Sequence, residues 1–137
     1  MYSFSEFLIE GVETNHEYHE SQYMINHNYH HDGVPISIYY EKSDYPHPHT
    51  YDVSFSVADK YMHNNLPKTK NLEILRSINH HIGKFVNREK PHELSFMGNT
   101  DKKHKIYGQY VKRLAKQTNG VVTGDNKYHI IKYKKGA

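Results

Sequence analysis

The chain has 137 residues and a formal net charge of +3 at neutral pH, a length typical of one domain. It contains no cysteine, which excludes disulfide bonds, thiolate metal sites and cysteine nucleophiles, and which favours a reducing compartment. Residues 1–70 carry ten acidic and four basic side chains, whereas residues 71–137 carry five and fourteen. This asymmetry predicts an acidic segment near a basic surface, or two surfaces for different partners.

Residues 1–33 are predicted to form an acidic N-terminal arm that is rich in histidine and tyrosine and has no Lys or Arg. Phe4, Phe7 and Leu8 favour a short helix near its start. Residues 15–33 show no hydrophobic period, which indicates a loosely ordered or partner-dependent segment. The apolar run at the start lacks a positively charged flank and is interrupted by glutamates, so we expect no signal peptide.

Residues 34–137 are predicted to form a single domain that begins with two antiparallel strands. Residues 35–41 alternate between apolar and polar side chains, and residues 51–57 do so more clearly. Each strand should therefore have one buried face and one solvated face. Pro46 and Pro48 exclude a helix in the segment between the two strands.

Apolar residues at helical spacing predict an amphipathic helix over residues 71–87, with Ser77, His80 and Lys84 on its polar side. The neighbouring His81 is expected to be exposed as well. The predicted apolar stripe consists of Leu72, Leu75, Ile78, Ile82, Phe85 and Val86. A short strand is expected at residues 92–97.

A cap at Asn99 or Thr100 predicts a second helix that continues to about residue 117 and is stopped by Asn119 and Gly120. Residues 121–123 and 128–133 follow as a predicted hairpin. The fold class is therefore α+β. Two helices should pack on one face of a mostly antiparallel sheet, in the order ββ-α-β-α-ββ, behind the N-terminal arm.

Basic side chains line one face of the second predicted helix. They are Lys102, Lys105, Lys112 and Lys116, with Arg113 at the flank. This pattern predicts a surface for nucleic-acid phosphates or for a protein partner, because lysines release counterions from a phosphate backbone. The pattern favours a solvated helix face over such a binding surface, since lysine is a favoured surface residue of helices.

Histidines cluster in three places: His16 with His19; His27 with His30 and His31; and His47 with His49. Glu13, Glu17 or Glu20 could join the first pair in holding a metal. No His-Glu-x-x-His pattern is present, so we expect adventitious binding of zinc or nickel and predict no functional metal site and no cofactor. We predict no catalytic residues, because no Gly-x-Ser-x-Gly elbow and no phosphate-binding glycine loop is present.

The predicted element order over residues 34–133, with Tyr107 and Tyr110 on the second helix, resembles the C-terminal part of the acetyl-CoA-dependent N-acetyltransferase fold. That family binds its cofactor pyrophosphate on a glycine-containing loop before the first of these helices. Residues 58–70 contain no glycine, so the resemblance implies topology without the cofactor site.

The chain also resembles small proteins of large tailed bacteriophages. Residues 3–10, residues 94–96, Ile106-Tyr107 and residues 112–114 carry this resemblance, and Leu8-Ile9-Glu10 matches a cleavage signal of phage prohead proteases. It implies a location in the virion or in the host cytoplasm.

The function expected from the sequence is that of a non-enzymatic phage protein that acts by binding, as a virion component or on a host factor. Its expected partner is a protein, and nucleic acid is the alternative partner at the basic helix face. No interaction with a membrane is expected. The other hypothesis is a small enzyme, either a degenerate acetyltransferase-like domain or a histidine-based phosphoesterase.

Overall fold

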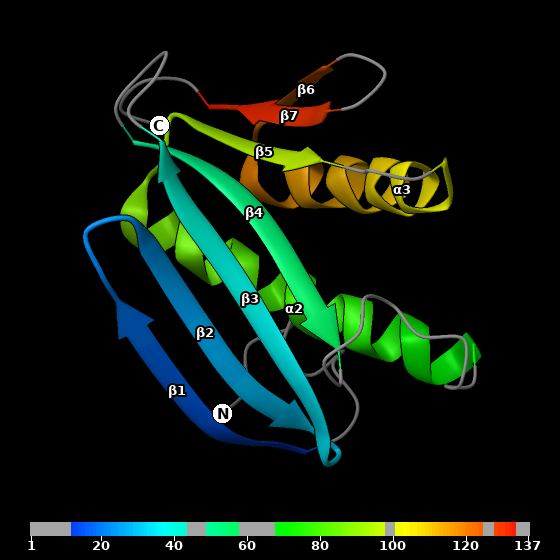
Figure 1. Ribbon diagram of the computed structural model, residues 1–137. Coiled ribbons are helices and arrows are strands. Elements are labelled where there is room, and N and C mark those ends of the chain that lie inside the picture. Colours follow the sequence, from blue (N-terminus) through cyan, green and yellow to red (C-terminus); the bar gives the residue numbers. More distant parts are fainter. Residues whose placement is uncertain (1–11, 44–48, 58–67, 98–100, 125–127, 134–137) are drawn as a thin grey trace.

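Seven strands and two helices make up the part of the chain that the computed structural model describes, residues 12–43, 49–57, 68–97, 101–124 and 128–133 (Figure 1). The strands are β1 (Glu13–Glu20), β2 (Met24–His31), β3 (Val34–Ser43), β4 (Thr50–Val57), β5 (Glu93–Met97), β6 (Val121–Gly124) and β7 (Tyr128–Lys132). The helices are α2 (Lys68–Glu89) and α3 (Asp101–Thr118). Neither helix is long and apolar enough to cross a membrane.

The strands form one sheet in the order β1-β2-β3-β4-β5-β7-β6. Neighbours are antiparallel except β4 and β5, which run parallel and are joined through α2. Parallel neighbours need such a crossover, whereas antiparallel ones need only a turn. The predicted α+β class and mostly antiparallel sheet are confirmed, but four strands precede the first described helix instead of two.

The apolar core lies between the sheet and the two helices. Residues at alternate positions of β3 and β4 face the helices, as in the cross-strand pair Ile38 and Phe55. Tyr40 stacks on Phe85 of α2, with ring centroids 3.8 Å apart. The core side chains of the helices are Ile74, Ile78, Ile82, Phe85, Val86, Tyr110, Val111, Leu114 and Ala115. Burying these residues supplies most of the drive to fold.

The inward face of α2 differs from the predicted one at its polar positions. Leu72, predicted to be buried, is 50% exposed, and Ile74 is buried in its place. Ser77, His80 and His81, predicted to be exposed, are all buried. The helix therefore carries polar groups into the interior alongside its aliphatic residues.

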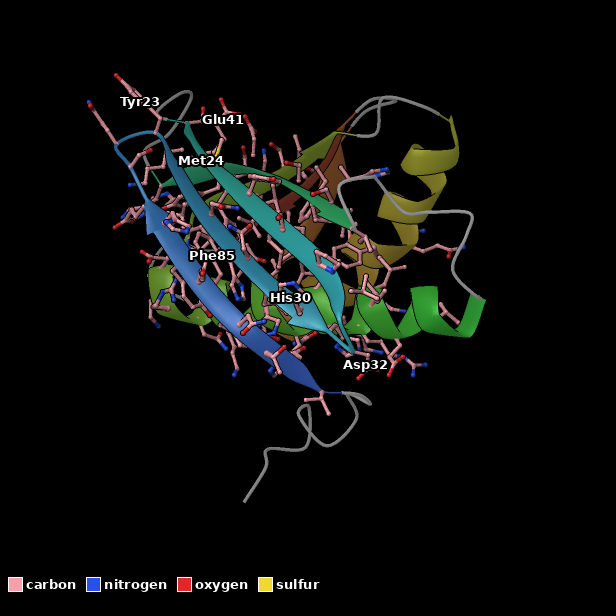
Figure 2. The ribbon with its side chains drawn as sticks, turned by 60° about the horizontal axis from the view of Figure 1, so that its bottom comes forward. Tyr23, Met24, His30, Asp32, Glu41 and Phe85 are labelled. Atoms are coloured by element: carbon pink, nitrogen blue, oxygen red, sulfur yellow. The ribbon has the colours of Figure 1, made fainter. Side chains whose placement is uncertain are left out.

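Residues 13–31 form β1 and β2, so the prediction of an irregular arm is wrong for this segment. β2 does alternate, but its buried positions include His27, Tyr29 and His31, which a hydropathy pattern does not register as core. Asp32 and Gly33, with φ of 50° and 80°, form the two-residue turn to β3. Asp-Gly is a preferred sequence for such a turn, so this dipeptide could have predicted the hairpin between β2 and β3. Figure 2 shows this turn at the opposite end of the strands from Tyr23 and Glu41.

The predicted helix at residues 3–8 lies outside the described residues. The predicted stop of the second helix is confirmed, because Asn119 has a φ of 60° and the Gly120 N–H donates to the Ala115 carbonyl at 2.9 Å. A Cβ at position 120 would overlap the side chain of Ile131. Glycine is therefore required there for close packing of α3 against β7.

Replacing Ile82 with alanine should lower the free energy of unfolding by about 2–5 kcal/mol, because its fully buried side chain would leave a cavity beneath the sheet. The measurement is a urea or thermal unfolding curve. Leu72→Ala on the exposed side of the same helix is the control, with an expected loss within about 0.5 kcal/mol. Equal losses in the two variants would contradict the observed helix register.

Candidate metal centre

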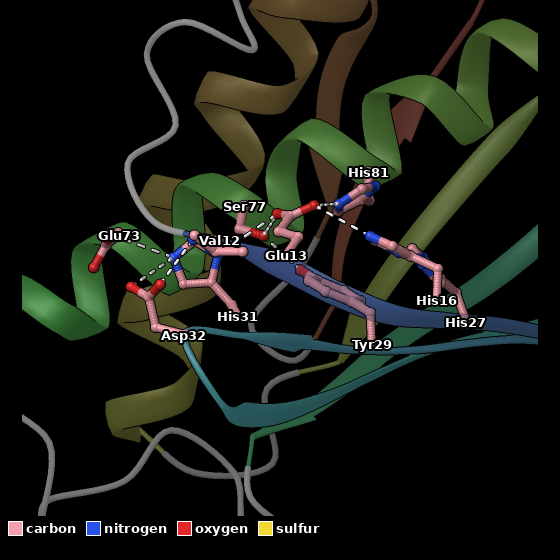
Figure 3. Close-up of polar contacts among 10 residues, drawn as sticks. All are labelled: Val12, Glu13, His16, His27, Tyr29, His31, Asp32, Glu73, Ser77 and His81. Carbon is pink, nitrogen blue, oxygen red and sulfur yellow. Dashed lines mark hydrogen bonds and ion pairs between the residues drawn. The ribbon is translucent and has the colours of Figure 1, made fainter.

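Polar side chains from β1, β2 and α2 meet between the sheet and the helix (Figure 3). Glu13 and His16 come from β1, and Ser77 and His81 come from α2. The contributions of β2 and its turn are His27, Tyr29, His31 and Asp32. The inward positions of this part of the sheet therefore carry ionisable groups where β3 and β4 carry aliphatic and aromatic ones.

A β-bulge in β1 places two of these groups on the same side of the sheet. Thr14 pairs with His30 and Glu17 pairs with Asn28, so β1 has one more residue than β2 in this interval. Asn15, with a φ of 57°, takes up the extra residue. In a regular strand, residues three apart face opposite sides. The bulge instead turns both Glu13 and His16 toward α2.

The carboxylate of Glu13 lies at the centre of the group. Its Oε1 accepts a hydrogen bond from His81 Nε2 at 2.7 Å and lies 3.6 Å from His16 Nε2. Its Oε2 accepts a hydrogen bond from the Ser77 hydroxyl. The Tyr29 hydroxyl lies 2.7 Å from Ser77 Oγ and donates to it, since the Ser77 proton is already given to Glu13.

Glu13, His16 and His81, here called the first cluster, offer three ligand atoms within 4.8 Å of one another. Two imidazoles and one carboxylate are a common ligand set for zinc and for iron(II).

Ring stacking and a hydrogen bond fix the orientation of His16. Its Nδ1 lies 2.9 Å from Nε2 of His27, so one of the two nitrogens donates to the other. The His16 ring stacks on Tyr29 at 5.1 Å, and the His27 ring stacks under Tyr18 at 4.2 Å. If His16 Nδ1 donates to His27, the lone pair of His16 lies on Nε2, the nitrogen that is 3.6 Å from Glu13 Oε1. Such an outer partner is usual for a metal-binding histidine.

The surroundings hold these groups in the protonation states that bind metals. Burial lowers the pKa of His16 and lowers that of His27 to about 3. Burial alone would raise the pKa of Glu13, but hydrogen bonds from His81 and Ser77 outweigh it and bring this pKa to about 2. At neutral pH His16 is therefore uncharged and Glu13 is ionised, as metal coordination by these two groups requires, and the neighbouring His27 is also uncharged.

A pocket of ≈ 70 Å³ adjoins the first cluster and shares His81 with it. Lys84 and Arg88 on α2 supply its positive charge. The other lining residues are Tyr18, Ile25, His27, Tyr40 and Phe85. Its size suits water or a small ion, since pockets for organic ligands measure roughly 300–1,000 Å³.

The histidine clusters predicted from the sequence are divided between the two faces of the sheet. His16 points inward, whereas His19, its predicted companion, is 65% exposed and pairs with Glu17 at 3.5 Å. His27 and His31 are buried, and His49 stacks with His92. His47 lies outside the described residues. The sequence named Glu13 and His16 as candidates but missed His81, which a helix register based on Ile74 would have placed inward.

The predicted basic residues lie on another element. Lys112, Arg113 and Lys116 are exposed on α3. Lys102 and Lys105 belong to the first turns of the same helix, and their side chains are outside the described set. The structure does not bring these residues to the first cluster. Searches of protein-family models, of curated proteins and of solved structures found no match to this chain.

In the metal-free protein, stability should fall as the pH decreases from about 6.5 toward about 3. The unfolded chain protonates His27 below pH 6.5 while the folded chain does not, so the unfolded state binds more protons in this range. Each such proton costs about 1.4 kcal/mol per pH unit. Glu13, whose pKa falls from 4.5 to about 2, adds a further loss below pH 4.5. Urea unfolding at a series of pH values measures the effect.

The variant His27→Gln should flatten this dependence between pH 6.5 and 4.5, because the group that titrates on unfolding is gone. His19→Gln, which changes an exposed histidine of the same hairpin, should keep the wild-type slope. If wild type and His27→Gln show the same slope, the buried His27 does not govern the pH dependence.

Proposed function

We propose that this protein binds a divalent transition-metal ion, with zinc as the best match, through Glu13, His16 and His81. The observation that carries this proposal is the convergence of ligand atoms of these three residues within 4.8 Å, with Glu13 Oε1 in contact with both His16 Nε2 and His81 Nε2. The three ligand groups come from β1 and α2, and a bulge and outer hydrogen bonds orient them, which is typical of a metal site and is not required of a solvated surface.

The spacing of the ligand atoms supports an ion between them. Ligand atoms about 2.0–2.1 Å from a tetrahedral zinc lie roughly 3.3 Å apart. His16 Nε2 and Glu13 Oε1 are 3.6 Å apart, close to that value. His81 Nε2 is nearer to Glu13, at 2.7 Å, because a proton now occupies the space between them. Binding would replace this proton with the metal, so affinity should decrease as the pH falls.

Three protein ligands leave a coordination position for water or a small anion. The adjoining pocket, with Lys84 and Arg88 in its lining, supports an anion there. The small volume favours binding of an ion over catalysis on an organic substrate. The proposal departs from the sequence-based expectation of no functional metal site, and it differs from the expected binding of a protein or nucleic-acid partner. A role in a bacteriophage virion or on a host factor is a further proposal, and it rests on the sequence resemblance alone.

The test of the metal site is a zinc titration of the full chain by calorimetry, with Co²⁺ absorption as a second readout. His16→Ala and His81→Ala should each weaken binding by more than the roughly 10–100-fold that loss of an outer partner costs. His19→Ala, an exposed histidine on the same strand, should not change the affinity. Equal weakening by His16→Ala and His19→Ala would show adventitious binding and contradict the proposal.

The second candidate function is binding of nucleic acid at the basic face of α3, favoured by the exposure of Lys112, Arg113 and Lys116. If lysines 102, 105, 112 and 116 all contact phosphates of duplex DNA, the log–log salt slope should be about −3.6. Each Lys→Ala substitution should reduce it by about one unit, with little sequence preference. Fluorescence anisotropy at several salt concentrations measures it. Absence of binding at low salt would leave this face as a solvated surface.

A further inference from the structure

A second group of metal-ligand atoms lies beside the first. His31, Asp32 and Glu73, here called the second cluster, also offer ligand atoms within 4.8 Å of one another. Figure 3 shows His31 between Glu13 on one side and the carboxylates of Asp32 and Glu73 on the other. The proposed function does not use these three residues.

The His31 ring is fully buried, yet neither of its nitrogens has a hydrogen-bond partner in the described part of the chain. Its Nε2 lies 3.4 Å from Glu73 Oε1 and 3.9 Å from Asp32 Oδ2. Its Nδ1 lies 3.6 Å from Glu13 Oε2. Buried polar groups nearly always have partners, and an unsatisfied one costs about 1–3 kcal/mol. A fully buried imidazole that faces three carboxylates at 3.4–3.9 Å without a hydrogen bond therefore points to a cation site.

The distances fit a cation held between these groups. Values of 3.4 and 3.9 Å are too long for hydrogen bonds between these groups, whose usual length is about 2.7–3.2 Å. The 3.4 Å distance is close to the roughly 3.3 Å that separates two ligands of a tetrahedral ion, and the 3.9 Å distance is longer by about 0.6 Å. In the first cluster, by contrast, one hydrogen bond already joins a histidine to the carboxylate.

The fold holds the ligands of the second cluster in place. Asp32 is the first residue of the β2–β3 turn, and its Oδ1 accepts a hydrogen bond from the Val12 N–H at 2.7 Å. This bond leaves Oδ2 on the His31 side. His31 is the last residue of β2, and Glu73 comes from the N-terminal part of α2. The side chain of Glu73 is 17% exposed, so the carboxylate is largely withdrawn from solvent.

We propose that the second cluster is another divalent-cation site, with His31 Nε2, Asp32 Oδ2 and Glu73 Oε1 as ligands. With Nε2 on the ion, Nδ1 carries the ring proton and faces Glu13 Oε2. Glu13 would then be a ligand of the first ion through Oε1 and an outer partner of the second ion through Oε2. A set of one imidazole and two carboxylates accepts Mn²⁺, Fe²⁺ or Zn²⁺.

The experiment counts the ions bound by the full chain in equilibrium dialysis against buffered free Zn²⁺. Wild type should bind two ions, Glu73→Gln one, His16→Ala one, and the double variant none. Asp32→Asn should also bind one, and asparagine tolerates the positive φ of this turn. Glu89→Gln, a partly exposed glutamate on the same helix, is the control and should keep two. Circular dichroism confirms that each variant is folded.

The outcomes separate the two sites. One ion that is lost in His16→Ala and kept in Glu73→Gln overturns the second site and leaves the first. One ion that is kept in His16→Ala and lost in Glu73→Gln overturns the first site and supports the second. A count unchanged by Glu73→Gln overturns the second site. Imidazole ¹⁵N spectra of His31 give an independent readout, because a metal-bound Nε2 carries no proton. A doubly protonated His31 in zinc-loaded protein overturns the second site in favour of an ion-paired imidazolium.

Discussion

The arrangement of this protein depends on keeping the carboxylate of Glu13 ionised beneath the edge of a sheet. A buried charge is costly unless hydrogen bonds and opposite charge surround it. Ser77 and His81 donate to its two oxygens, and the Tyr29 hydroxyl supports Ser77 in turn. Ser77 and His81 belong to α2, Tyr29 belongs to β2 and the acceptor Glu13 belongs to β1, so these contacts require the helix to be docked on both strands. The polar contacts therefore specify how α2 lies against the β1–β2 hairpin, and they do so with directional bonds that aliphatic packing lacks.

The interior consequently has two different halves. Under β3, β4 and β5 it is apolar, with Ile38, Phe55 and Leu94 against the helices. Under β1 and β2 it is aromatic and polar, with His27 and Tyr29 in stacked rings. α2 spans both halves and supplies aliphatic residues to one and Ser77 and His81 to the other. The first half supplies the free energy of hydrophobic burial. The second half holds the side chains that we propose to bind ions.

The sequence predicted well the elements whose patterns are made by aliphatic residues. The strand at 51–57, both helices and the C-terminal hairpin were predicted because each repeats apolar residues at its own period. β1 and β2 were missed because histidine and tyrosine occupy their inward positions. The predicted stripe of α2 began at Leu72, which the structure leaves half exposed, so His81 was placed outside. The bulge at Asn15, which turns His16 inward, leaves no mark in a hydropathy pattern. The sequence therefore predicted only part of the site. Glu13 and His16 could be named as candidates, but that both side chains lie on the face of the sheet toward α2 could not be predicted.

The order of the elements along the chain also determines when the ligands meet during folding. β1 to β4 are successive antiparallel neighbours, so their contacts are close in sequence and cost little loop entropy. β5 reaches β4 only after the long crossover that contains α2. We expect the hairpin with Glu13 and His16 to form early and His81 to arrive when the helix docks. An ion that needs all three ligands then binds only chains that have passed this docking step. By mass action it would stabilise the docked state relative to partly folded states, through the contact between Glu13 and His81, which lie 68 residues apart in the sequence.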